Sequence, residues 1–561
     1  MPIKRSEKSF LVEASIISIS NFTVKIIGVL FSIPMSNLLQ DNMGIFNAAY
    51  NVYAMLYMIS TAGLPVATSR MVAAAAKRGR RYETQRIYKL CLLMFGIIGF
   101  VCAAFMFAFA GRIASFTEHG DSVYAMRVIA PSLFTICIVS AVRGYLQGLR
   151  NMVPTAVSQF IEAFFKLTVG FGMAYWSNQR GDAPAVQAAW AMSGITIGII
   201  LGMIYLLVYK RFFHKNDVEL LDESSDCNKE ITKKLLKIAI PVTITSSALY
   251  LSHFADTLVI KKALISSGFS DAVATSMFSV YTTLSTKLAD LLPSTLVFPI
   301  AISILPAVSG ALAVKNMQGV RDYVKSSLRI SGLIALPCGA ILFVLSRPLI
   351  ALLYGSGWGK EIIINGSVVM PIDLASNALS ILAVGILFIS LVSTTNALLQ
   401  AIGKTWLPMV SVLCGSILLL ISDVVLIRNN TVNIYGAPIS TVLCYIVAYC
   451  LNTYFLKKSG MDEVSPLGLF IKPLFAALLS GGASFGVYSL MRLIVTGDGR
   501  LDNLLLLAVS GIAGVVVYAI VLLAIKGITD TEVRLLPFGN RIAAVLIKFR
   551  LLRALEDKND K

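Results

Sequence analysis

The sequence contains little charge for its length. Asp, Glu, Lys and Arg make up 14% of the 561 residues, and hydrophobic residues make up 57%. A soluble globular protein carries about 25% charged residues, so this chain cannot cover several water-exposed domains. The mean hydropathy is +0.78. Composition therefore excludes a series of soluble domains and predicts an all-α polytopic protein whose outer surface faces lipid.

Patterns typical of metal sites, disulfides and enzymes are also lacking. The eight cysteines form no CxxC pair, and the three histidines are scattered. Gly403-Lys404-Thr405 lacks the upstream glycine of a phosphate-binding loop. No outer segment is long enough to carry paired catalytic residues, as a membrane polymerase or ligase would need. We therefore expect no metal, no cofactor, no catalytic residue and no enzyme activity, and ATP hydrolysis by this chain is excluded.

What the sequence does contain is a series of long apolar stretches. About 20 apolar residues are needed to cross a bilayer as a helix, and we place fourteen such spans. They are 12–36, 45–76, 88–110, 124–149, 153–177, 184–209, 233–260, 276–313, 327–352, 371–401, 406–428, 434–456, 467–494 and 502–526.

Basic residues fix the expected orientation. The net charge is +18, which in a soluble protein would suggest nucleic acid. Here the Lys and Arg residues concentrate on alternate sides of the spans, above all at Lys77-Arg78-Gly79-Arg80-Arg81 and in the loop 210–237. By the positive-inside rule, both termini should lie in the cytoplasm. We expect a lipid bilayer as partner and no nucleic acid.

The two halves of the chain resemble each other. Leu64–Ser69 matches Phe298–Ser303, and Leu146-Gln147-Gly148 matches Leu399-Gln400-Ala401, in the same order. Two repeated six-helix bundles with two further helices are a transporter plan. We therefore predict the following segments: an N-terminal lobe (1–209), a cytoplasmic linker (210–232), a C-terminal lobe (233–458), two extra helices (459–528) and an amphipathic tail on the inner membrane surface (529–561).

Ionisable residues inside the spans are the candidate functional residues, because each is costly in lipid unless it is paired or hydrated. The first half offers cations without an acidic neighbour in sequence, Lys25, Arg70 and Arg143, with Asn21 on the Lys25 face. A cationic, water-filled cavity is the functional interpretation. The alternative is that Arg70 and Arg143 extend to the interface.

Other ionisable residues have local partners. Glu162 and Lys166 are spaced i, i+4 and can neutralise each other, and Lys287 and Asp290, spaced i, i+3, can also pair locally. His253 is a candidate protonation site, and Asp256 or Asp290 could hold a coupling cation. A hydrogen-bonded core histidine and a structural Lys287–Asp290 pair are the alternatives.

Several segments resemble a known superfamily. They are Ser20–Gly28, Gly63–Arg70, Arg143–Gly148 and Leu535–Gly539. With the helix plan and the basic first half, the chain resembles the multidrug/oligosaccharidyl-lipid/polysaccharide exporter superfamily. Within it, the chain looks closest to the stage V sporulation protein B and MurJ-like lipid II flippases of Gram-positive bacteria.

That resemblance implies alternating access by two lobes in a bacterial plasma membrane. The cargo would be an undecaprenyl-pyrophosphate-linked glycan, moved to the outer leaflet for cell-wall or spore-cortex synthesis, alongside cell-wall synthesis enzymes. Lys25, Arg70 and Arg143 would offset dehydration of the pyrophosphate. Lipid II flippases carry an arginine pair in the first span, where this sequence has Lys25 alone; their important acidic residue corresponds to Asp41. A coupling cation or the membrane potential would drive transport.

Two other cargoes remain open. A capsule or teichoic acid precursor would present a different headgroup to the same kind of cavity. A drug/cation antiporter of the same superfamily would instead favour acids in the first-half cavity, where cations dominate here. A structural scaffold would not need Lys25 in mid-bilayer.

Overall fold

The computed structural model describes an all-α membrane protein. The described residues are 20–528, apart from 21–22, 29, 79, 150, 214–227, 298–307, 309–311, 313–315, 356–357, 359–360, 365–366, 405, 430, 462–465, 496 and 498. These residues form helices and loops, with two three-residue strands that pair with each other, β1 (Ile362–Ile364) and β2 (Ser367–Val369). The expected tail, most of the linker and Asn21 lie outside the described residues.

The helices follow one another along the whole chain. In the first part they are α2 (Met43–Thr61), α3 (Gly63–Lys77), α4 (Arg81–Phe116), α5 (Val123–Gly148), α6 (Val153–Phe165), α7 (Phe171–Gln179), α8 (Pro184–Phe213), α9 (Asn228–Ser266) and α10 (Asp271–Val280). Then come α11 (Thr286–Leu292), α13 (Met317–Tyr354), α14 (Pro371–Ala401), α15 (Leu407–Ile427), α16 (Gly436–Lys458), α17 (Pro466–Ile494) and α18 (Arg500–Ala524).

Short 3-10 and π-helical segments connect or interrupt these helices. The 3-10 turns are η1 (Gln40–Asn42), η2 (Gly120–Ser122) and η7 (Asn433–Tyr435), and the π-helical segments are η3 (Lys166–Gly170), η4 (Tyr281–Ser285) and η5 (Pro293–Val297). A π-turn inside a helix is rare and often lies at a functional site.

Ten helices are long and apolar enough to cross a membrane, counted over the described residues alone. They coincide with ten of the predicted spans, and the polytopic all-α fold is confirmed. The predicted span 153–177 corresponds to α6, η3 and α7, and 233–260 lies inside α9. Parts of 12–36 and 276–313 lie outside the described residues.

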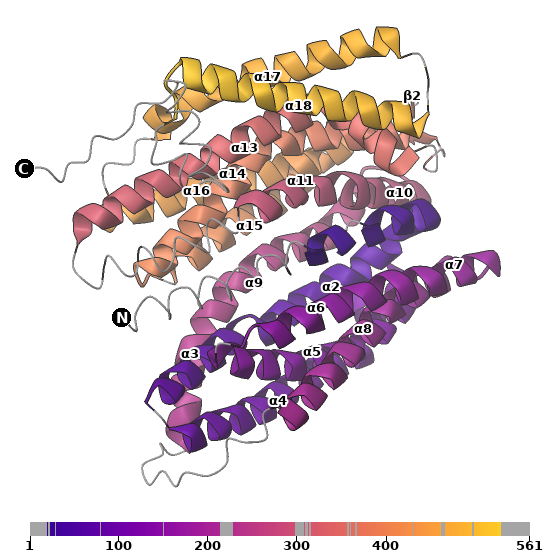
Figure 1. Cartoon of the computed structure of the whole chain (residues 1–561). Coiled ribbons are helices and arrows are strands. Elements are labelled where there is room, and N and C mark those ends of the chain that lie inside the picture. Colours follow the sequence, from indigo (N-terminus) through magenta and orange to yellow (C-terminus); the bar gives the residue numbers. More distant parts are fainter. Residues whose placement is uncertain are drawn as a thin grey trace, which may run out of the picture. The chain divides into compact units, whose positions relative to one another are not determined.

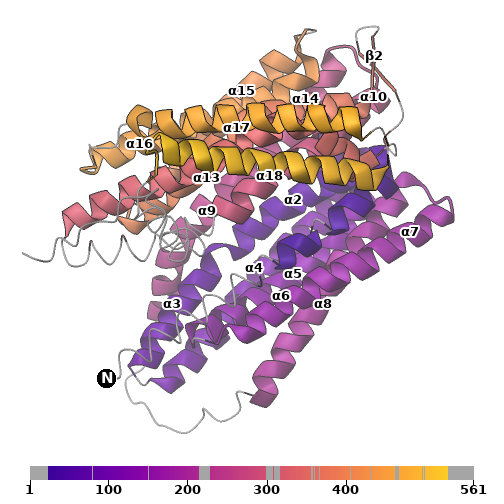
Figure 2. The same ribbon diagram turned by 45° about the horizontal axis from the view of Figure 1, so that its top comes forward.

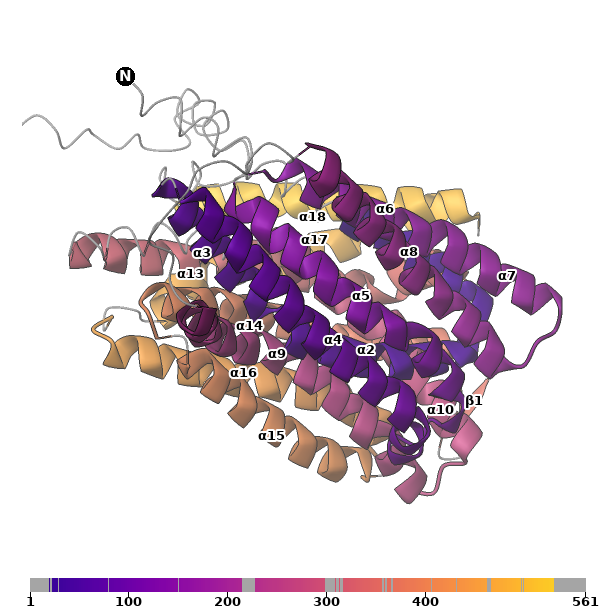
Figure 3. The ribbon, with the colours of Figure 1, turned by 90° about the horizontal axis from the view of Figure 1, so that it is seen from below.

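By their contacts the residues form two compact units. The first comprises Met1–Thr283, Gly357–Val368 and Ser416–Ala437. In it, α5 lies between α4 and α8, and α6 packs on α8 (Figure 3). The helices α6, η3 and α7 follow one line beside α8 (Figure 2). The predicted lobe boundaries stay a prediction.

The second unit comprises Leu284–Ser356, Val369–Gly415 and Pro438–Lys561. Here α13 packs along α14 on one side and along α17 on another, and α17 and α18 lie side by side (Figure 1). A buried apolar cluster joins these C-terminal helices to α13, formed by Leu333, Leu336, Ala476, Ala477, Tyr518 and Leu522. The Tyr518 hydroxyl also donates to the Leu333 carbonyl at 2.9 Å.

The second predicted span is broken between α2 and α3. Gly63 begins α3, and a Cβ at this position would lie 2.0 Å from the Ala239 carbonyl oxygen of α9. The Gly63 backbone N–H donates to the Thr243 hydroxyl of α9 at 3.0 Å. Pro65 removes one further helix hydrogen bond at this point. The sequence Gly-Leu-Pro therefore allows α9 to approach the backbone closely.

Candidate functional site

A cavity of about 240 Å³ lies in the first unit. It is bordered by the first segment (the helical residues 20 and 23–28) and by helices α2, α5, α6 and α8. Its wall contains Arg143, Glu162 and Lys166 together with Gln159 and Tyr57. The apolar remainder of the lining is Val24, Ile27, Gly28, Ala163, Ile195 and Ile199. Charged groups thus face a small volume whose other walls are mostly hydrocarbon.

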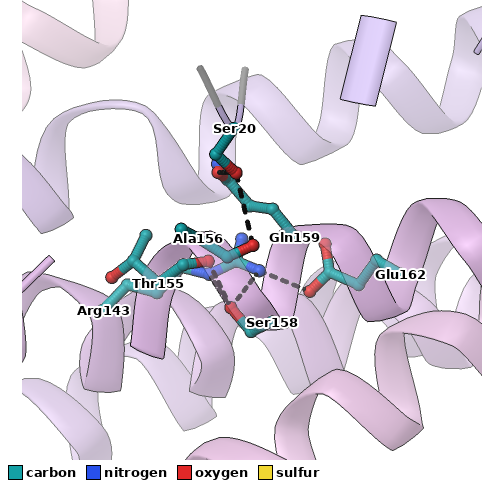
Figure 4. Close-up of polar contacts among 7 residues, drawn as sticks. All are labelled: Ser20, Arg143, Thr155, Ala156, Ser158, Gln159 and Glu162. Atoms are coloured by element: carbon teal, nitrogen blue, oxygen red, sulfur yellow. Dashed lines mark hydrogen bonds and ion pairs between the residues drawn. The ribbon is translucent and has the colours of Figure 1, made fainter. Parts of the chain in front are cut away.

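Arg143 is held at this cavity by α6. Its Nε and Nη2 donate to the Ser158 hydroxyl at 3.0 and 2.7 Å, and Nη2 donates to Glu162 Oε1 at 2.7 Å. Figure 4 shows the guanidinium between these two side chains. The side chains of Arg143 and Glu162 are 12% and 18% exposed. Arg143 has no acidic neighbour in sequence, but the fold supplies an acidic partner from the next helix, 19 residues away.

Glu162 and Lys166 do not form the predicted i, i+4 pair. Over the part of the chain that the structure describes, the Glu162 carboxylate pairs with Arg143. The Lys166 ammonium instead lies 4.8 Å from the ring centroid of Phe31 and 5.6 Å from that of Tyr50. A cation over an aromatic face is attracted by the ring quadrupole. Lys166 begins the π-turn η3, where the α-helical spacing that favours i, i+4 pairs ends.

Three glycines of α8 determine how close α6 and η3 can lie. A Cβ on Gly194 would be 2.3 Å from Gly170 Cα, and one on Gly198 would be 2.7 Å from the Glu162 carbonyl oxygen. A Cβ on Gly202 would be 2.9 Å from Glu162 Oε1. Small residues at i, i+4, i+8 allow two membrane helices to approach closely. This glycine face therefore sets the position of Glu162 and Lys166.

An aromatic row follows α2 beside the cavity. Ring centroids are 6.2 Å apart for Phe46–Tyr50, 5.9 Å for Tyr50–Tyr53 and 6.0 Å for Tyr53–Tyr57. Neither this aromatic row nor the glycine face of α8 was predicted from the sequence. The aromatic residues are spaced by four, three and four positions, and the glycines by four and four. Residues at such spacings share one face of a helix, so both features could have been predicted from the sequence.

The first segment contributes through Ser20 as well as through apolar residues. The Ser20 hydroxyl lies 3.3 Å from the Ala156 carbonyl and 3.4 Å from Gln159 Oε1, with both acceptors on α6 (Figure 4). Lys25 is half-buried, but it is not among the residues that line the cavity. This segment is thus fastened to α6 close to the Arg143 network.

Of the other residues predicted to bind cargo in the first half, Arg70 is not among the described residues that line the cavity. Arg70 is exposed on α3, and no ion pair of the described residues includes it. Asp41 belongs to η1, and Asn21 is outside the described residues. Binding roles for Lys25, Arg70, Asn21 and Asp41 stay predictions.

The predicted ion-coupling residues occur in both units. His253, half-buried, and Asp256, 6% exposed, belong to α9 in the first unit. Lys287 and Asp290 belong to α11 in the second unit. Their coupling roles and the Lys287–Asp290 pair stay predictions. Among the described residues, no group of three or more His, Cys, Asp or Glu side chains could hold a metal ion.

A second polar cluster lies where α4 turns into α5. Lys261 of α9 is buried and donates to the Glu118 carbonyl and to Asp271 Oδ1, the latter at 2.9 Å. His119 is 3% exposed, its ring centroid is 4.7 Å from that of Phe278, and its Nδ1 is 2.6 Å from the Thr117 carbonyl oxygen. The His119 pKa is lowered from 6.5 to about 4, chiefly by burial and also by the Lys261 charge, while the Thr117 hydrogen bond and Asp271 oppose the shift. This imidazole is therefore neutral at physiological pH.

The long apolar helices, the broken second span and the charged intramembrane cavity define a multi-pass membrane transporter. Solved structures share this helical fold. A lipid II flippase MurJ in an inward closed conformation matches with a TM-score of 0.61 and 14% identity, over 90% of this chain and 97% of that one. An inward-facing multidrug resistance MATE family transporter of the MOP superfamily matches with a TM-score of 0.60 and 17% identity, over 78% of this chain and 99% of that one.

The chain belongs to the polysaccharide biosynthesis protein family, whose model matches residues 10–312; a MatE model matches residues 241–425. Three relatives are from Bacillus subtilis (strain 168). The uncharacterized membrane protein YabM is 26% identical, over 94% of this chain and 95% of its own length. Stage V sporulation protein B is 24% identical, over 96% of this chain and 99% of its own length. Lipid II flippase MurJ is 23% identical, over 79% of this chain and 81% of its own length. The resemblance to this exporter superfamily is thereby confirmed.

Proposed function

We propose that this protein moves an undecaprenyl-pyrophosphate-linked saccharide, lipid II in particular, from the inner to the outer leaflet of a bacterial plasma membrane. The observation that carries the proposal is the first-unit cavity, in which two cations, Arg143 and Lys166, face one described acid, Glu162. A net positive cavity with apolar walls suits a phosphate-bearing headgroup and repels a cationic drug. The relatives named as a lipid II flippase and a sporulation protein support the same cargo class.

The groups present suit the parts of such a headgroup. The Arg143 guanidinium matches phosphate oxygens in its fork geometry, and the Lys166 ammonium adds a point charge. The Tyr57 ring lines the same cavity and offers an apolar face with a hydroxyl, a surface against which a sugar can stack. The polyprenyl chain would stay in the bilayer.

The test uses cells depleted of their own lipid II flippase, in which a membrane-impermeant probe reports lipid II in the outer leaflet. The wild-type chain should restore access of the probe. Lys166→Ala and Arg143→Gln should reduce restoration at least tenfold while the protein still inserts, because one or two charge-assisted contacts of about 1.5–3 kcal/mol each are lost. Lys25→Ala and Arg70→Ala test the two sequence-based predictions in the same assay.

The matched control is Lys262→Ala, which removes a cation of α9 whose ammonium lies over the Phe116 ring at 4.4 Å. Lys262 is not among the residues that line the cavity. It should restore access like the wild type. A wild-type chain that inserts but restores nothing would reject lipid II as cargo. A capsule or teichoic acid precursor would be tested next, and drug efflux after it.

A further inference from the structure

The carboxylate of Glu162 occupies hydrogen-bond donors that an anionic headgroup would use. Arg143 Nη2 donates to Glu162 Oε1 at 2.7 Å, and both side chains line the cavity. A carboxylate and a phosphate present the same kind of oxygen pair to a guanidinium. The two therefore compete for Arg143.

Arg143 has a second hydrogen-bond partner besides Glu162. Its Nε and Nη2 both donate to the Ser158 hydroxyl, which in turn donates to the Thr155 carbonyl at 2.8 Å. The guanidinium is thus oriented by a neutral serine whose own proton is already used. Departure of the carboxylate would free a donor without releasing the arginine.

The Glu162 carboxylate lies in a space beside Gly202 of α8. The missing side chain of Gly202 leaves the space in which Oε1 lies, since a Cβ there would be 2.9 Å away. Because the carboxylate lies at the wall of a cavity of about 240 Å³, rotation of its own side chain can move it off Arg143. No helix has to unfold for that exchange.

The charges of the described lining favour such an exchange. Counted as ionised groups, Arg143 and Lys166 contribute two positive charges and Glu162 one negative charge, so the described lining has a formal net charge of +1. A pyrophosphate diester carries about two negative charges. One can pair with Lys166 while the other displaces the Glu162 carboxylate from Arg143. Carriers need binding that is strong enough for entry and weak enough for release.

We propose that Glu162 is a built-in competitor of the cargo: it neutralises Arg143 while the cavity is empty, yields the arginine to the pyrophosphate, and returns to promote release. This inference rests on the proposed function, since it presupposes an anionic headgroup. It assigns Glu162 a role opposite to that of a binding residue. Removing its charge should strengthen binding and slow transport.

The experiment is a titration of the purified full-length protein, in lipid nanodiscs, with undecaprenyl pyrophosphate. Glu162→Gln should bind the lipid more tightly, on the order of tenfold, and should flip it more slowly than the wild type. Arg143→Gln should bind weakly. In the double variant the gain from Glu162→Gln should vanish, because the carboxylate acts through Arg143.

Asp373→Asn is the matched control. It removes the carboxylate of another arginine pair, Arg347 Nε to Asp373 Oδ1 at 2.6 Å, whose side chains are 72% and 39% exposed. Binding and flipping should equal those of the wild type. If Glu162→Gln fails to accumulate, Glu162→Asp replaces it: the shorter side chain withdraws the charge from Arg143, and a smaller gain in affinity is expected.

The outcomes separate this inference from the proposed function. A wild-type protein that binds no undecaprenyl pyrophosphate contradicts the proposed function itself. Wild-type binding together with equal or weaker binding by Glu162→Gln overturns the competitor role and makes Glu162 a residue that only positions Arg143. A gain that persists in the Arg143→Gln background also overturns it.

Discussion

At the scale of single residues, the Arg143 network shows how a membrane protein keeps charge in an apolar environment. The guanidinium contacts a serine and a carboxylate from the adjacent helix. Removing one partner from such a pair leaves an uncompensated charge and costs about 3–5 kcal/mol. This cost keeps Glu162 at Arg143 whenever no other anion is present.

His119 gives a pH-dependent stability at the same scale. Its pKa is about 4 in the folded protein and 6.5 in the unfolded chain, because burial disfavours the charged ring. Between these values the unfolded chain binds a proton that the folded protein does not, so stability falls as the pH drops from 6.5 towards 4. The full loss is about 3 kcal/mol, of which about 2 kcal/mol has occurred at pH 5.

The substitution His119→Gln should therefore flatten the decrease of the unfolding temperature between pH 7.5 and pH 5. Thermal unfolding of both proteins in the same detergent, followed by tryptophan fluorescence, measures this. A variant that loses as much stability as the wild type would show that other groups cause the acid sensitivity.

At the scale of helices, the α8 glycines are the most sensitive packing positions near the cavity. In Gly198→Ala the new methyl group would overlap the Glu162 carbonyl oxygen, a backbone atom that cannot rotate away. We expect a loss of about 1–3 kcal/mol of stability and weaker binding of undecaprenyl pyrophosphate. Binding in nanodiscs and thermal unfolding report the two effects separately.

Gly172→Ala is the control for that prediction. Gly172 belongs to α7, and a Cβ there meets no atom within 4 Å. Alanine is the better helix former by about 1 kcal/mol, so this variant should be as stable as the wild type or more stable, with unchanged binding. Equal effects of the two substitutions would mean that close packing of α8 on α6 is not what positions the site.

The helices also show which features can be predicted from the sequence. Long apolar stretches such as 371–401 were located correctly, because hydropathy directly measures membrane partition. The Arg143–Glu162 pair was missed, because its members are 19 residues apart on two helices. Local spacing favoured Glu162–Lys166 instead, and the π-turn that begins at Lys166 has no recognised sequence signal.

Helix lengths were predicted less well than helix positions. The span 327–352 belongs to α13, which extends from Met317 to Tyr354. Its 38 residues, which are kinked at Leu345, would rise about 57 Å along the helix path, well beyond a hydrocarbon core of about 30 Å. Hydropathy marks only the part in lipid, and the polar first turns of α13 carry no membrane signal.

At the scale of the whole molecule, the charge distribution predicts orientation. We expect both termini and the loop Lys77–Arg81 to face the cytoplasm. In a background where the exposed cysteines Cys414 and Cys450, and Cys227 of the predicted cytoplasmic linker, are replaced by serine, Arg180→Cys should react with a membrane-impermeant maleimide in intact cells. Tyr82→Cys should react only after permeabilisation. The reverse pattern would invert the orientation.

The packing of α17 and α18 on α13 has a consequence for biosynthesis. The α13 face that contains Gly332 and the Leu333 carbonyl is covered by Phe470 and Tyr518. Those residues leave the ribosome more than 130 residues after α13 begins to be made, on the order of ten seconds at bacterial or eukaryotic elongation rates. During that interval the nascent helix must rest against lipid or the insertion machinery. The second unit is thus completed only after α17 and α18 have been made.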